Sequence, residues 1–159
     1  MKTLVGAAVI IACFAALPAG AAGSSEPPSS PARASDPVYD KAVAATQNQD
    51  WTGAQKLLQQ ALESNSNNAN YHNLYAYAIR KGPNPNLDLA FKHYNEALRI
   101  DPNHRGAREY LGEAYLMVGN LPKAKEQLAA LDKLCFLPCE EYRELKKAVA
   151  DYEEKRAKP

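Results

Sequence analysis

At 159 residues, with 46% hydrophobic and 23% charged residues, the chain has enough apolar material for one domain that folds without metal ions or many disulfides. Its 19 Lys and Arg residues nearly balance its 18 Asp and Glu residues, so the formal net charge is only +1. Nucleic acids and anionic membranes bind proteins with a basic surplus, so this balance argues against either of them as the main partner.

Residues 1–22 have the pattern of a secretory signal peptide. Lys2 gives a positive start, an apolar run covers residues 4–17, and small residues follow. This run is shorter than the roughly 20 apolar residues of a membrane-spanning helix, so we expect cleavage, no membrane span in the processed chain, and a periplasmic or secreted location. Two alternatives stay open: an uncleaved anchor, and a lipoprotein that begins at Cys13.

Residues 23–35 are rich in Ser, Pro and Ala and have little to bury, which predicts a disordered linker. Beyond them the apolar residues recur at helical spacing, turn residues fall at regular intervals, and no stretch alternates as a strand would. The pattern predicts an all-α fold with helices at residues 37–47, 51–64, 70–81, 87–100, 105–118, 121–134 and 138–156.

The second, fourth and sixth predicted helices repeat one pattern of residue types. In four columns of equivalent positions, the separations are 36 and then 34 residues. These columns are Trp51, Leu87 and Leu121; Ala54, Ala90 and Ala124; Leu58, Tyr94 and Leu128; and Ala61, Ala97 and Leu131. Small alanines let two helices approach closely, so the repeat predicts a stack of similar helical hairpins.

The chain resembles the tetratricopeptide repeat family, whose unit has about 34 residues. The resemblance rests on YLGEAY at residues 110–115 and on ALRIDP at residues 97–102. It implies a right-handed α-solenoid of about three hairpins in residues 36–134, with units at about 35–68, 69–104 and 105–134. The first unit departs from the family pattern, with Lys41 and Ala42 where Leu-Gly is usual.

Residues 135–159 follow the third unit as a CxxxC turn and a helix that caps the exposed apolar face of the last hairpin. Because export leads to an oxidising compartment, we expect Cys135 and Cys139 to form a structural disulfide. Their three-residue spacing differs from the thioredoxin-type redox motif. It is similar to the copper site of the Sco family, so metal binding, redox exchange and unpaired thiols stay open as alternatives.

No pattern in the chain is typical of an enzyme. It has no Gly-rich phosphate loop, no GxSxG and no HExxH motif. The predicted helices separate His72, His93 and His104, which therefore lack the spacing of ligands on one helix. We expect no catalytic residues, no metal site and no cofactor.

In the tetratricopeptide family, partners bind the concave surface formed by the first helix of each hairpin. The resemblance implies a partner-binding groove with residues from three helices. They are Tyr39 and Val43; His72, Asn73, Ala76 and Arg80; and Glu109, Glu113 and Leu116. Some family members clamp a chaperone's terminal carboxylate with lysines and asparagines, but only Asn73 occupies a comparable position here, which argues against that role.

These observations predict an exported interaction module or scaffold that binds a peptide or protein partner in the cell envelope. The mixed charge of the groove suits an extended peptide or a folded partner better than a charged small molecule. The alternative is a redox or metal-handling accessory that acts through Cys135 and Cys139.

Overall fold

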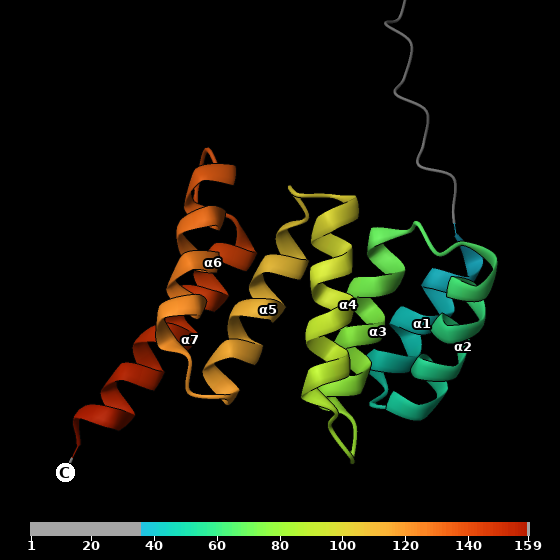
Figure 1. The fold of residues 1–159 in the computed structure, drawn as a ribbon, viewed down its shortest axis with the longest axis horizontal. Helices are drawn as coiled ribbons and strands as arrows, with labels where there is room; N and C mark the ends of the chain where they lie inside the picture. Colours follow the sequence, from blue (N-terminus) through green and yellow to red (C-terminus); the bar gives the residue numbers. More distant parts are fainter. Residues whose placement is uncertain (1–35, 159) are drawn as a thin grey trace, which may run out of the picture. The chain divides into compact units, whose positions relative to one another are not determined.

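The computed structural model describes residues 36–158. The predicted signal peptide, the linker and Cys13 lie outside these residues. Within them the chain forms seven α-helices and no strand (Figure 1). The helices are α1 (Pro37–Gln47), α2 (Trp51–Ser64), α3 (Ala69–Lys81), α4 (Leu87–Ile100), α5 (Arg105–Met117), α6 (Leu121–Leu134) and α7 (Glu140–Ala157).

Six of these helices begin where a side chain caps the first turn. The first backbone N–H groups of a helix have no partner within it, and a capping side chain accepts a hydrogen bond from one or two of them. The capping residues are Asp36, Asp50, Asn68, Asn86, His104 and Asn120. Such caps explain why the bounds of α1, α2, α4 and α6 agree with the prediction.

The start of α7 was predicted wrongly. The sequence predicts a start at Pro138, whereas α7 begins at Glu140, after an N-cap residue, Cys139, with an extended backbone. The sulfur atoms of Cys135 and Cys139 lie at bonding distance, so the segment between them forms a tight loop and helical geometry begins only after it. Elsewhere, α3 starts one residue earlier than predicted and α5 ends one residue earlier.

The helices pack as successive hairpins. In Figure 1, α1 pairs with α2, α3 with α4, and α5 with α6, while α7 packs against both α5 and α6. The first helices of the hairpins, α1, α3 and α5, also contact one another in that order. This arrangement leaves one surface formed by first helices only, as the family resemblance implies.

The repeated alanines hold the hairpins together. Ala54, Ala90 and Ala124 are each 0% exposed, at the same position in the second helix of each hairpin. Leu58 and Tyr94, one turn further along, are also fully buried. The prediction that these columns form the packing surface is therefore confirmed.

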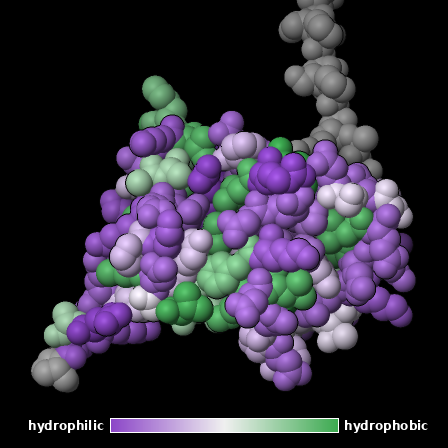
Figure 2. Space-filling model, in the orientation of Figure 1, coloured by the Kyte–Doolittle hydropathy of each residue, from purple (hydrophilic) through white to green (hydrophobic). Residues whose placement is uncertain are grey.

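The face of the described chain that Figure 2 shows is mostly polar. On the face drawn in Figure 2, hydrophobic side chains form small patches separated by polar ones. No helix in residues 36–158 is both long and apolar enough to cross a lipid bilayer.

Candidate functional site

A groove lies on the surface formed by the first helices. It has a volume of about 330 Å³ and lies between α1, α3 and the middle of α5. Its lining residues are Tyr39, Val43, Thr46, Gln47, Asn73, Leu74, Tyr77 and Tyr110. Tyr39, Val43 and Asn73 were predicted from the sequence, and the structure brings these three together.

Aromatic rings give the groove rigid walls. The ring of Tyr77 lies 4.6 Å from that of Tyr110, centre to centre, and meets Trp51 edge-on at 5.9 Å. On the α1 side, Tyr39 stacks on Tyr71 at 6.4 Å. Because each ring is held by another, these side chains offer apolar contact area with little conformational freedom left to lose on binding.

Asn73 supplies the most informative polar group of the groove. The residue is only 5% exposed, and its Oδ1 atom accepts no hydrogen bond. On its other side, Gly106 leaves room for the amide, since a Cβ there would lie 3.4 Å from Nδ2 of Asn73. A buried acceptor without a donor costs about 1–3 kcal/mol, so a donor that reached this atom would remove that cost.

Arg80 is a structural residue and not an open part of the groove, which corrects the prediction. It is 6% exposed and donates hydrogen bonds to the Tyr94 hydroxyl at 3.2 Å and to the Glu113 carboxylate at 2.6 Å. Its guanidinium group also lies over the rings of Tyr77 and Tyr110, at 5.5 and 5.8 Å from their centres. It therefore joins α3 to α4 and α5.

Glu109 and Glu113 lie on α5 beside the groove. Glu113 is paired with Arg80 and keeps 30% of its side chain exposed. Glu109 is half-buried, and no ion pair within the described residues reaches its carboxylate. Burial, and then the carboxylates of Glu113, Glu141 and other acidic neighbours, raise the pKa of Glu109 to about 8.

Three predicted groove residues lie elsewhere. Ala76 is fully buried in the core between α3, α4 and α5, and Leu116 packs against the cluster formed by α6 and α7. His72 is buried against α4. The face of α3 that forms the groove carries Asn73 and Tyr77, one position along from His72 and Ala76, and one position on a helix corresponds to about 100° of rotation.

His72 instead forms a pair with His93 that the sequence did not reveal. Their Nδ1 atoms lie 2.7 Å apart, and Nε2 of His72 lies 2.9 Å from the carbonyl oxygen of Ser66. A carbonyl oxygen can only accept, so Nε2 of His72 donates to it, and Nδ1 of His72 accepts from His93. Burial and the neighbouring His72 lower the pKa of His93 to about 4.

Five of the lining residues were not predicted from the sequence. They are Thr46, Gln47, Leu74, Tyr77 and Tyr110. Tyr77 follows Asn73 by four positions, so a helical projection centred on Asn73 would have found it. Tyr110 occupies the first position of the YLGEAY motif, where its sequence context indicates packing more strongly than binding.

Two other surface pockets offer fewer features for specific binding than the groove does. One of about 750 Å³ lies at the loop of residues 83–88, whose side chains are mostly exposed. Another, of about 450 Å³, lies between α6 and α7. Within residues 36–158, no three His, Cys, Asp or Glu side chains are grouped so that they could hold a metal ion.

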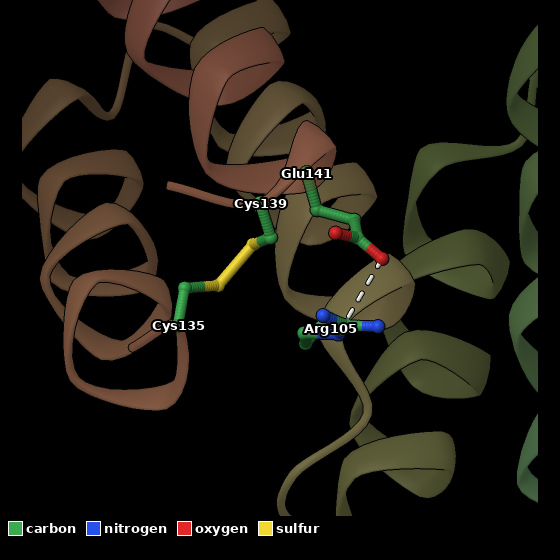
Figure 3. Close-up of a disulfide and its surroundings, with 4 residues drawn as sticks. All are labelled: Arg105, Cys135, Cys139 and Glu141. Atoms are coloured by element: carbon green, nitrogen blue, oxygen red, sulfur yellow. Dashed lines mark ion pairs between the residues drawn. A yellow bond between two sulfur atoms is a disulfide. The ribbon is translucent and has the colours of Figure 1, made fainter. Parts of the chain in front are cut away.

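The two cysteines of the described chain lie close together at the end of α6 (Figure 3). Their Cα atoms are 5.7 Å apart, and the sulfur atoms point toward each other at bonding distance. Beside them, Arg105 of α5 forms an ion pair of 3.6 Å with Glu141 of α7 (Figure 3). Both contacts hold the start of α7 against the last hairpin.

The stack of helical hairpins with a groove along its first helices defines an α-helical repeat protein, an α-solenoid. Two family models, both described as tetratricopeptide repeat, match residues 39–105 and 86–149. The chain belongs to the tetratricopeptide repeat family, which confirms the resemblance seen in the sequence. No curated protein sequence matches the chain.

Solved structures with the same fold include a bacterial chaperone and a yeast domain. The type III secretion translocator chaperone SycD of Yersinia enterocolitica is 16% identical, with a TM-score of 0.66 over 76% of this chain and 84% of that one. SycD in complex with a peptide of the translocator YopD is 20% identical and has a TM-score of 0.62. The match covers 77% of this chain and 93% of that one. The TPR2B domain of yeast Sti1, in a complex with pHsp70, is 21% identical, with a TM-score of 0.64 over 76% and 100%.

Proposed function

We propose that the protein is an interaction module without catalytic activity, and that it binds an extended segment of a partner protein in the groove of α1, α3 and α5. The observation that carries this proposal is the buried Oδ1 atom of Asn73, which has no hydrogen-bond donor although it lies in a groove walled by tyrosines. An extended peptide offers backbone N–H donors and side chains that fit between aromatic rings.

Two solved structures with the same fold are complexes with a partner, which supports the proposal that this chain also binds one. SycD, which shares the fold, forms a complex with a peptide of YopD, and the Sti1 domain forms one with pHsp70. The groove of this chain has its own lining, so we propose the mode of binding and not the same partners.

We also propose that the protein works outside the cytoplasm, as an envelope or secreted scaffold. Support comes from the signal-like residues 1–22 and from the two cysteines at bonding distance, which an oxidising compartment would join as a disulfide. In this proposal the disulfide is structural, because it connects α6 to the capping helix α7.

A capture experiment with the full processed chain as bait tests the function. Thr46 lines the groove, and Thr46→Arg would place a long, charged side chain in it. Gln59→Arg adds the same side chain on the exposed face of α2 and serves as the matched control. We expect a partner from an envelope extract to bind the unchanged chain and the control but not Thr46→Arg. Equal capture by all three would contradict the groove as the binding site.

A further inference from the structure

The acidic side chains beside the groove indicate what kind of segment fits there. Glu109 and Glu113 project from α5, and Glu141 and Glu144 of α7 lie within electrostatic reach of Glu109. Two guanidinium groups oppose these four carboxylates, and both are already engaged. They are Arg80, bound to Glu113, and Arg105, paired with Glu141.

Two of the four carboxylates, Glu109 and Glu144, are left without a guanidinium partner, and of these two Glu144 is exposed to solvent. Glu109 is half-buried, and none of the ion pairs or hydrogen bonds within residues 36–158 includes it. Its charge acts on Tyr77 and on the adjacent Tyr110, and both of these tyrosines line the groove. Glu109 does not line the groove itself, but it directly precedes Tyr110 on α5 and lies within electrostatic reach of two residues that do.

In its charged form, the half-buried Glu109 carboxylate has no counter-ion and therefore favours a cation over a neutral or acidic group. An acidic segment would instead meet up to four carboxylates. The charge of the site is thus opposite to what a clamp for a terminal carboxylate requires.

We propose that the bound segment is basic, with a lysine or arginine side chain paired to Glu109 while a donor of the same segment binds Oδ1 of Asn73. This inference rests on the proposed function of the groove and adds the chemical class of its ligand.

Binding of a cation would also move a proton. In the free protein, burial and the acidic neighbours on α5 and α7 raise the pKa of Glu109 to about 8, while Arg80 on α3 acts in the opposite direction. At pH 7 the carboxyl is therefore mostly protonated. A bound cation favours the charged form, so each basic segment would release up to about one proton as it binds.

Selection from a random library of extended peptides tests the inference on the full processed chain. We expect the selected peptides to be enriched in lysine and arginine and to bind Glu109→Gln about tenfold more weakly. Glu63→Gln, at an exposed position of α2, is the matched control and should bind as the unchanged chain does. Calorimetry of a selected peptide in two buffers of different ionisation enthalpy should show proton release that Glu109→Gln abolishes.

The outcomes separate the inference from the function on which it rests. Peptides without a basic bias, or equal affinity for Glu109→Gln and the unchanged chain, would overturn the basic ligand but leave the groove as a peptide site. Failure of the folded, unchanged chain to select any peptide would overturn both. Circular dichroism of each variant establishes that it is folded.

Discussion

Leu145 of α7 covers Gly112 of α5 so closely that a Cβ atom on Gly112 would lie 2.6 Å from Cδ2 of Leu145. Leu145 is 0% exposed in this position. The missing side chain at residue 112 therefore lets α7 approach α5 and cover the apolar face of the last hairpin, which a solenoid must cap to remain soluble.

This contact predicts that Gly112→Ala destabilises the fold, although alanine is the better helix former by about 1 kcal/mol. We expect a loss of about 1–3 kcal/mol in the free energy of unfolding, measured by urea denaturation, because the added methyl group overpacks the contact. In a Leu145→Ala background the same substitution should cost much less. A neutral or stabilising effect of Gly112→Ala alone would contradict the close packing of α7.

The ion pair between Arg80 and Glu113 predicts non-additive effects on stability. Arg80→Ala removes a buried side chain that also bonds to Tyr94, so we expect a loss of about 3 kcal/mol. Glu113→Gln should cost about 1–2 kcal/mol, since it leaves the buried guanidinium group with a weaker acceptor. In urea denaturation the double variant should lose about 1–2 kcal/mol less than the sum of the two, whereas additive losses would mean that the pair is not coupled.

The raised pKa of Glu109 predicts a pH-dependent loss of stability. The folded chain holds a proton on Glu109 up to a pKa of about 8, whereas the unfolded chain releases it near the ordinary value of 4.5. The contribution of this group to the free energy of unfolding is therefore fully present below about pH 4.5 and is lost as the pH rises toward 8. Because Glu109 is partly exposed, solvent screening reduces the effect to about 1–2 kcal/mol.

The measurement compares Glu109→Gln with the unchanged chain by urea denaturation at several pH values. The variant should be equally stable near pH 4.5 and more stable by about 1–2 kcal/mol at pH 8.5. Glu63→Gln, on the exposed face of α2, should show no such divergence. A difference in stability between Glu109→Gln and the unchanged chain that stays constant across these pH values would mean that the pKa of Glu109 is not raised.

The helices could be predicted from the sequence because their signals are local. Asp36, Asp50 and Asn86 each precede a helix and cap it through their own side chains, and the alanine columns repeat at fixed spacing. The start of α7 was predicted two residues too early, because proline favours the first turn of a helix, whereas Pro138 lies in the loop between Cys135 and Cys139.

The groove was predicted only in part because it depends on the rotation of each helix about its axis. Asn73 and Tyr39 face the groove as expected, but a rotation of one position turns His72 toward α4. The contact of His72 with His93 joins residues 21 positions apart, and no helical spacing reveals it. The burial of Arg80 likewise follows from tertiary packing and not from its place in the repeat.

The cysteine pair predicts a redox-dependent stability. If the proposed disulfide joins Cys135 and Cys139, replacing both with serine should cost about 2 kcal/mol on a chain-entropy estimate for so short a loop. A reductant should lower the stability of the unchanged chain to that of the variant and leave the variant unaffected. Rapid labelling of the purified, unreduced chain by a thiol reagent would show that the cysteines are not joined.

The most direct test of the central claim is amide hydrogen exchange of the processed chain, free and bound to a captured or selected segment. The claim is that the groove formed by α1, α3 and α5 holds an extended partner segment. We predict that binding slows exchange around Asn73 and Tyr77 on α3 and in the neighbouring turns of α1 and α5. Protection confined to α2, α4 and α6, with the first helices unchanged, would contradict it.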